Sequence, residues 1–475
     1  MPKIDQREFS EISSATNSRV TLLHPKEQYN VGETMQVRVD MRDHKGNLKA
    51  YGGDFILSRI VSPTLKAAAS GIVKDLRNGT YLVDFTLFWP GQVEVVLQLI
   101  HSTETVDVLW RVKQHPNDKF VFTGTFANTS VTEKAKCFSY SKYGLPLCTY
   151  KDKRDNETYF CLKAKTLPCE TLLFLQCMNG ENPNMTNEEK KLLDRSNIGV
   201  RIPNDFQPVT VVGDLLLSNK KCLFGAPNPV PSGFFHMKIW YSSFCKLRSF
   251  SDTNDINSCL QGKTLHLRGD STIRQWLEYL TEKLNDLKYL IYSNKYKPMY
   301  AADGKRNITV DWKMHGHPWI TQIVVSIKDG NYVAKDGNYV AREVDRISGG
   351  PDTAVVVAIG QHIRPYPLEL YIKKLLNIRK AIQRLLLRNP ATTVFVKLEN
   401  IRELSADTLR FSNWHGYMQN LAQHEVFQGL NVTVLDAWDM TIADNTQDVH
   451  PLEHVVHSQI AIFLSYLCPS SVGFH

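Results

Sequence analysis

The chain has 475 residues, of which 43% are hydrophobic and 22% charged, and its formal net charge is +8. This length predicts two or three domains that each bury a core, and the composition excludes a disordered or fibrous protein. The positive charge is spread over isolated residues and pairs, without a basic stripe interleaved with aromatic residues, so nucleic acid binding is not expected. A basic surface favours anionic substrates such as sialylated or sulfated glycans.

Residues 18–113 are predicted to form an immunoglobulin-like β-sandwich, preceded by an N-terminal tail over residues 1–17. The alternation of apolar and polar residues over 35–41, 81–88 and 93–100 is typical of half-buried strands. Turn-forming Gly, Pro and Asn residues separate these runs. Strands at this spacing indicate two packed sheets.

Residues 114–260 show little periodicity and are predicted to be an irregular connector held together by disulfides. Of the nine cysteines in the chain, five lie within residues 137–177. Their spacings do not fit Cys-x-x-Cys, so a zinc site is not expected, and a disulfide-linked module in an oxidising lumen is the better interpretation. The odd count leaves one thiol outside these bonds or bonded to another chain.

Six Asn-x-Ser/Thr sequons also point to a lumenal or secreted protein: Asn78, Asn128, Asn156, Asn184, Asn307 and Asn431. The first 30 residues, however, contain no apolar signal segment, and no run of 18 apolar residues occurs that would span a membrane. Two explanations stay open: the chain begins downstream of a signal or anchor, as a shorter isoform would, or the protein is cytosolic with reduced cysteines. We favour the first and expect the Golgi lumen or secretion.

Residues 261–475 are predicted to form a three-layer α/β/α domain with a parallel sheet. The uninterrupted apolar run 353–360 is typical of a strand buried on both faces, and 392–399 and 430–436 are further strands. Amphipathic helices are predicted over 366–388 and 414–427. In such sheets ligands bind beyond the carboxyl ends of the strands. Polar residues that follow the strands are therefore expected to meet at one edge: Ser271, Gly360-Gln361-His362, Glu399-Asn400 and His450.

Ser271 is the predicted nucleophile. A short alternating run over 264–267 leads into a Gly269-Asp270 turn, and a helical periodicity begins after Ser271. A serine at such a turn has its hydroxyl exposed beside the unpaired N–H groups of the helix start, which suits an attack that creates an oxyanion. The alternative interpretation is an ordinary serine N-cap.

The predicted base lies near the C-terminus, in the segment Asp444-Asn-Thr-Gln-Asp448-Val-His450-Pro451. A serine nucleophile needs a base and a carboxylate to orient it. In an extended loop, residues i and i+2 project to the same side, so Asp448 and His450 are expected to face one cleft. The chain order Ser, Asp, His also occurs in several α/β hydrolases. The alternative is a solvated Asp-x-His turn held by Pro451.

The spacing of His450, His454 and His457 is also compatible with a metal-binding helix face. No acidic or cysteine ligand occurs in register with them, so no metal is expected.

Several short segments together resemble one family, in that family's order. In the front half they are 51–55, 78–81 and 137–140, and in the back half 268–271 with Arg274, 360–362, 397–400, 448–451 and 463–468. On these segments the chain is identified as a member of the neurexophilin and PC-esterase domain family. The front half is similar to neurexophilins, which are secreted β-sandwich ligands. The back half resembles PC-esterase domains, which have SGNH-type folds.

The resemblance implies an O-acetyltransferase that moves acetyl from acetyl-CoA to a hydroxyl of sialic acid on mucin-type glycoproteins. It implies that Ser271 takes the acetyl group, that His450 acts as base and then acid, and that the Ser271 N–H forms part of the oxyanion hole. Further oxyanion or substrate-binding groups are expected at Gly316, His362 and Asn400. His362 stands where the SGNH pattern has Asn.

The carboxylate of the triad is less well defined, because Gln447 stands where PC-esterases have Asp. Asp448 is the first candidate and Asp444 the second. Arg274, one helical turn after Ser271, is expected either to pair with a substrate carboxylate or to form an ion pair with Asp270 or Glu278.

Two other functions stay open. The same Ser, His and Asp residues would hydrolyse an acetyl ester if water reached the acyl-enzyme, and water exclusion cannot be inferred from sequence. The neurexophilin-like half instead favours a non-catalytic secreted ligand that binds a protein partner.

Overall fold

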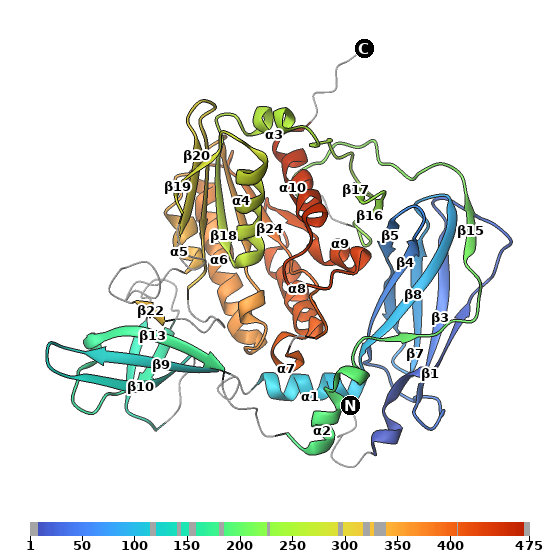
Figure 1. Cartoon of the computed structure of the whole chain (residues 1–475), viewed down its shortest axis with the longest axis horizontal. Coiled ribbons are helices and arrows are strands. Elements are labelled where there is room, and N and C mark those ends of the chain that lie inside the picture. The colour runs from blue at the N-terminus through green and yellow to red at the C-terminus, as the bar shows by residue number, and fades with distance from the viewer. Residues whose placement is uncertain are drawn as a thin grey trace.

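The computed structural model describes residues 8–469 except 115–119, 140–143, 152–157, 180–184, 226–228, 293–297, 317–323, 327–338 and 406. Within these residues the chain forms a β-sandwich, a smaller sheet and an α/β domain (Figure 1). The sandwich and the smaller sheet lie on either side of the α/β domain in this view.

The sandwich consists of two sheets that enclose an apolar core. The first, in the order β1-β3-β7-β6, contains β1 (Ser13–Leu22), β3 (Thr34–Asp43), β7 (Thr80–Thr86) and β6 (Ile72–Asp75). The second runs β17-β16-β5-β4-β8-β15-β2, with β14 also paired to β8. Its strands are β17 (Ile239–Ser242), β16 (Gly233–His236), β5 (Ala67–Ser70), β4 (Phe55–Ser62), β8 (Gly91–His101), β15 (Val209–Val212), β2 (Tyr29–Asn30) and β14 (Val200–Ile202). Alternate residues of these strands are buried, as expected for strands with one face on a core.

The sandwich differs from its predicted bounds at both ends. Strand β1 begins at Ser13, inside the predicted tail, because it pairs with β3 along most of its length. Helix α1 (Thr103–Lys113) follows β8, with Ser102 accepting the N–H of Thr105 as its N-cap.

The predicted connector is not irregular. It contributes β14 to β17 to the sandwich and most of a smaller sheet in the order β11-β12-β10-β9-β13-β22. These strands are β11 (Leu147–Lys151), β12 (Thr158–Leu162), β10 (Thr132–Phe138), β9 (Phe120–Ala127), β13 (Leu172–Asn179) and β22 (Val324–Ser326). Turns and cysteine-containing segments separate these strands, and their alternation was not recognised from the sequence. The short α2 (Asn187–Leu192) follows the sheet.

Disulfides hold this part of the chain together, as predicted. Four bonds join described cysteines: Cys137–Cys161, Cys148–Cys169, Cys222–Cys245 and Cys259–Cys468. The ninth cysteine, Cys177, is a buried thiol. This pattern is consistent with an oxidising, secreted or lumenal environment. In the described chain, no helix has both the length and the apolar character required to span a bilayer.

The α/β domain is built on a sheet in the order β19-β20-β21-β18-β23-β24-β25. The strands are β19 (Lys288–Ile291), β20 (Met299–Asp303), β21 (Ile308–Lys313), β18 (Thr264–Gly269), β23 (Thr353–Ala358), β24 (Thr393–Lys397) and β25 (Thr433–Leu435). The run from β21 to β25 is parallel, and β19 and β20 are antiparallel. The predicted parallel-stranded α/β domain is therefore confirmed.

Helices cover both faces of this sheet. On one face α5 (Val340–Asp345), α6 (Leu368–Arg388) and α8 (Asn413–Phe427) pack on β23 and β24. On the other, α3 (Thr253–Leu260), α4 (Ser271–Lys283) and α10 (Glu453–Leu467) pack on β18 and its neighbours. The short α7 (Thr408–Phe411) precedes α8, and α9 (Ala437–Asp444) follows β25. The predicted helices 366–388 and 414–427 correspond to α6 and α8.

Candidate functional site

Ser271 is the first residue of α4, directly after the turn that ends β18. Gly269 has a φ of +153°, and a Cβ atom there would lie 1.8 Å from the carbonyl oxygen of Ala358. Glycine is therefore required for the end of β18 to pass this close to β23. Asp270 caps α4 by accepting the N–H of Thr272 at 2.9 Å. The turn leaves Ser271 half-buried at the carboxyl edge of the sheet.

His450 reaches Ser271 from the loop between α9 and α10. Its Nε2 atom is 2.7 Å from the hydroxyl oxygen of Ser271. The pKa of His450 lies below its usual value, mainly because the ring is buried and also because the positive Arg274 is near. A neutral imidazole at this distance can accept the serine proton. The structure thus brings together the two residues for which the sequence predicted nucleophile and base.

The two candidate carboxylates have other contacts. Asp448 is exposed, and its Oδ1 accepts the main-chain N–H of His450 at 3.0 Å. Asp444 is 2.6 Å from Nε2 of His454. Asp448 therefore braces the backbone that carries His450, and Asp444 serves a different histidine. Neither makes a hydrogen bond to the His450 ring among the described residues.

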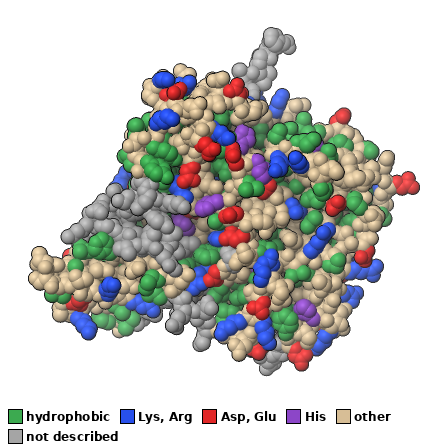
Figure 2. All heavy atoms as spheres, viewed as in Figure 1, with side chains coloured by type: hydrophobic (Ala, Val, Ile, Leu, Met, Phe, Trp, Pro, Cys, Tyr) green, Lys and Arg blue, Asp and Glu red, His purple; other side chains and the backbone are tan. Residues whose placement is uncertain are grey.

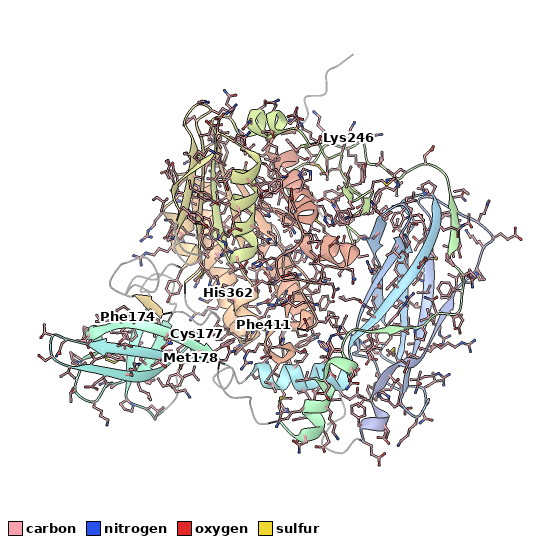
Figure 3. The ribbon with its side chains drawn as sticks, in the orientation of Figure 1. Phe174, Cys177, Met178, Lys246, His362 and Phe411 are labelled. Carbon is pink, nitrogen blue, oxygen red and sulfur yellow. A yellow bond between two sulfur atoms is a disulfide. The ribbon has the colours of Figure 1, made fainter. Side chains whose placement is uncertain are left out.

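Gly316 and His362 lie at the carboxyl ends of β21 and β23, on the two sides of β18. His362 is 2.9 Å from His315 through its Nδ1 atom, and the carbonyl oxygen of Gly316 is 2.7 Å from Nδ1 of the same His315. Figure 3 shows His362 at the lower end of the α/β domain. The sequence context of His315 predicts no role for it in the site.

Arg274 and Asn400 have partners within the protein. Nε of Arg274 is 2.8 Å from Glu278, the ion pair expected as one alternative from their i, i+4 spacing, and its guanidinium lies over the Trp312 ring. Oδ1 of Asn400 accepts from Lys397 at 3.1 Å, and its buried Nδ2 has no hydrogen-bond partner among the described residues. Asn400 thus belongs to the polar interior beneath the edge.

That interior contains charged side chains whose burial the sequence did not predict. Burial raises the pKa of Glu399 to about 7, and the charge of Asp270 adds to this. For Asp270 the effect of burial is outweighed by the nearby His362, Thr272 and Lys397, which hold its pKa below the usual value. Oδ2 of Asp270 accepts the N–H of Gln361 at 3.1 Å. These contacts fix the loop after β23 to the turn that carries Ser271.

The three histidines considered as a metal-binding helix face have different partners, and His450 lies before α10 begins. His450 contacts Ser271, His454 contacts Asp444, and His457 is 2.7 Å from the hydroxyl of Tyr279. No group of three or more His, Cys, Asp or Glu side chains within the described residues is arranged to hold a metal ion. Histidine and acidic side chains are exposed near the middle of the face that Figure 2 shows.

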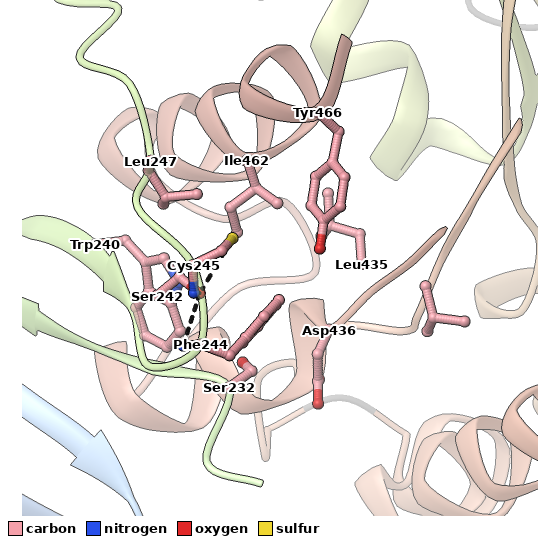
Figure 4. A pocket seen from close by; sticks show the side chains of 11 residues that line it. Ser232, Trp240, Ser242, Phe244, Cys245, Leu247, Leu435, Asp436, Ile462 and Tyr466 are labelled. Atoms are coloured by element: carbon pink, nitrogen blue, oxygen red, sulfur yellow. Dashed lines mark hydrogen bonds between the residues drawn. The ribbon is translucent and has the colours of Figure 1, made fainter. Parts of the chain in front are cut away.

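Two cavities of the described chain do not include the site. The one in Figure 4, lined by residues that include Trp240, Asp436 and Tyr466, has a volume of about 10 Å³, the space of about one water molecule. A larger one of about 480 Å³ lies between the sandwich and the α/β domain, next to Phe55 and Tyr417. Neither Ser271 nor His450 lines them.

Four of the six sequons can be located. Asn78, Asn128, Asn307 and Asn431 are exposed, as glycan attachment requires. Asn156 and Asn184 lie outside the described residues. Their glycosylation stays a prediction.

The fold and the site define a class: a disulfide-linked protein in which a β-sandwich half precedes an α/β domain with a Ser–His pair at its carboxyl edge. Residues 240–468 match the family model described as NXPE family member 4-like, C-terminal domain, and residues 4–179 match the neurexophilin model. The chain belongs to the neurexophilin and PC-esterase domain (NXPE) family, which confirms the assignment made from the motifs.

Two solved structures are distantly similar. One is FdeC, an adhesin of Escherichia coli, with 12% sequence identity and a TM-score of 0.15. The match covers 42% of this chain and 66% of FdeC, which is just under two thirds of its length. The other is a carbohydrate esterase described as having divergent catalytic and non-catalytic binding functions, at 8% identity and a TM-score of 0.19, over 94% of each chain. Scores this low do not establish a shared fold.

Proposed function

We propose that the protein is a sialic acid O-acetyltransferase that works through an acetyl-serine intermediate on Ser271. The observation that carries the proposal is the 2.7 Å contact between the Ser271 hydroxyl and Nε2 of His450. Membership of the NXPE family supports an acyl-transfer chemistry for this pair. The proposal includes an SGNH-type fold for the α/β domain and an immunoglobulin-like fold for the sandwich.

In the first half-reaction, His450 takes the proton of Ser271 while the serine oxygen bonds to the acetyl carbon of acetyl-CoA. The carbon–sulfur bond then breaks, and His450 returns the proton to the departing thiolate. The N–H of Ser271 at the helix start, with Gly316 as a second donor, would stabilise the oxyanion.

In the second half-reaction, a hydroxyl of the sialylated glycan attacks the acetyl group. His450 takes the hydroxyl proton, the new ester bond forms, and the bond to Ser271 breaks. His450 then gives the proton back to the serine oxygen, so the enzyme is regenerated. Asp448 would hold the His450 backbone in place. Arg274 would release Glu278 and form an ion pair with a carboxylate of the substrate instead.

The acceptors would be mucin-type glycoproteins in the Golgi lumen or outside the cell, and the neurexophilin-like half would bind a protein ligand. The four disulfides and the exposed sequons support such a location.

The test is to incubate purified protein with radiolabelled acetyl-CoA and a sialylated acceptor. We expect label on the sugar, and a loss of about a thousandfold or more for Ser271→Ala. Ser251→Ala, at an exposed serine, is the matched control. Label released only as acetate would mean hydrolysis, and no turnover with retained partner binding would mean a non-catalytic ligand.

A further inference from the structure

Two buried histidines, His315 and His362, form a ring-to-ring pair that spans the end of β18. His315 follows β21 and His362 follows β23, the strands on either side of β18. Nε2 of His315 is 2.9 Å from Nδ1 of His362, and the ring centroids are 5.0 Å apart. The pair therefore lies across the strand whose end carries Ser271.

The contacts of His315 define which nitrogen carries each hydrogen. The carbonyl oxygen of Gly316, 2.7 Å from Nδ1 of His315, can only accept, so this nitrogen carries the hydrogen. Burial, together with the proximity of His362, lowers the pKa of His315 to about 3, so the ring is neutral and its Nε2 holds a lone pair. His362 must then donate from Nδ1 to that lone pair.

His362 is left with Nε2 for any further contact. Burial lowers the pKa of His362, and its neighbours Arg402, His450 and Arg274 lower it further against the opposing charge of Asp270. A neutral ring with its hydrogen on Nδ1 has a lone pair at Nε2 and accepts hydrogen bonds there. When His450 takes the serine proton, its new positive charge disfavours a second positive ring nearby. His362 is thus unsuited to donate to an oxyanion.

We propose that His315 is a positioning residue that keeps the hydrogen of His362 on Nδ1, so that Nε2 of His362 accepts a hydrogen bond from a second hydroxyl of the acceptor. The inference rests on the proposed function and narrows its substrate class. The acceptor carries two neighbouring hydroxyls: one attacks acetyl-Ser271, and the other is held by His362. The oxyanion is then stabilised by main-chain N–H groups without a side-chain donor from His362.

The role of His315 is tested by the ratio in which the acetyl-enzyme passes its acetyl group to a sugar or to water. p-Nitrophenyl acetate serves as the acyl donor and a methyl sialoside as the acceptor, and transfer and hydrolysis are measured together. Because loss of one neutral hydrogen bond to the acceptor weakens its binding about fivefold, we expect His315→Phe to lower the ratio of transfer to hydrolysis by that factor.

His315→Gln is the conservative variant, because its side-chain oxygen can accept the hydrogen of His362 in place of Nε2. We expect it to keep the ratio within about twofold of the wild type. A general structural defect would lower transfer and hydrolysis together and leave their ratio unchanged, so the ratio separates positioning from folding.

A second measurement changes the acceptor and compares the wild type with His315→Phe. An acceptor in which the neighbouring hydroxyl is replaced by hydrogen should show the same fall of about fivefold, and His315→Phe should no longer distinguish the two acceptors. Equal transfer to both acceptors by the wild type overturns the inference, as does an unchanged ratio in His315→Phe. If the wild type forms no acetyl-Ser271, with Ser271→Ala as reference, the proposed function fails and the inference fails with it.

Discussion

The interface between the sandwich and the α/β domain and the carboxyl edge of the sheet each bury a carboxyl group whose pKa is raised to about 7. At the interface, Asp439 accepts from the hydroxyl of Ser70 in the sandwich and from the N–H and hydroxyl of Ser232, the latter at 2.7 Å. At the edge, Glu399 lies 3.5 Å from Arg364 and is influenced by the charges of Asp270 and Lys397.

The two carboxyl groups differ in their surroundings: Asp439 has neutral hydrogen-bond donors and one neighbouring carboxyl group, Asp436, whereas Glu399 lies among the cations Arg364 and Lys397 and the anion Asp270. Asp439 joins two domains through dipoles, which suits a carboxyl group that is protonated at moderate pH. Glu399 belongs to a group of balanced charges beneath the Ser271 turn, where removing one member leaves the others uncompensated. A change of charge should therefore cost more at the edge than at the interface.

The largest effect is expected for Asp270→Asn. The substitution keeps the shape and the cap of α4 but removes the negative charge beside Lys397 and His362, so we expect a loss of about 3 kcal/mol in the free energy of unfolding. Urea denaturation measures it. Asp252→Asn, at the exposed N-cap of α3, keeps a capping oxygen and should cost about 0.5 kcal/mol or less. Equal losses in the two variants would contradict the role of charge balance.

A smaller loss is expected for Asp439→Asn at the interface. The amide can still accept from Ser70, but its NH₂ group would face the N–H of Ser232, so we expect a cost of about 1 to 2 kcal/mol. Differential scanning calorimetry measures it. A loss as large as that of Asp270→Asn would remove the distinction between the two regions.

The raised pKa of Asp439 also predicts how the stability of the protein depends on pH. Its pKa in the folded protein, about 7, lies above the ordinary value of 3.8, so between these pH values the folded state binds more protons than the unfolded state. Its contribution to stability is therefore largest below about pH 4 and falls as the pH rises toward about 7. The wild type should lose stability across this window more steeply than Asp439→Asn, which does not titrate there. Parallel profiles would count against the raised pKa.

The smallest effect is expected for Asp448→Asn. Its amide oxygen can still accept the N–H of His450, so acetyl transfer should fall by less than about tenfold, far less than when the carboxylate of a triad is changed. Steady-state kinetics of acetyl transfer measures it. A fall of about ten-thousandfold would mean that Asp448 orients the ring during the reaction.

Much of the α/β domain could be predicted because its signals are local. The apolar run that forms β23 is buried on both faces, and the periodicity of α6 is long. The pairing of Ser271 with His450 followed from motifs that sit at strand and helix ends. Part of the connector was missed because its last strands are short and pair with distant segments, as Phe235 of β16 does with Ala68 of β5.

The charges beneath the site could not be predicted for a different reason. A charged residue in a sequence is normally solvated, so nothing distinguishes Lys397 or Asp270 until the fold shows that both are buried. The His315–His362 contact joins residues 47 positions apart from two strands that are not adjacent in the sheet. Only the order of the strands brings them together.

The disulfide between Cys259 and Cys468 has a consequence for how the protein is made. It closes a segment of 209 residues that contains the whole seven-stranded sheet, Ser271 and His450. During translation Ser271 leaves the ribosome well before His450, and the covalent tie between α3 and the end of α10 must wait for Cys468. The nascent chain therefore carries a serine without its imidazole partner for most of the synthesis of this domain, and oxidation secures the pair only when that synthesis is nearly complete.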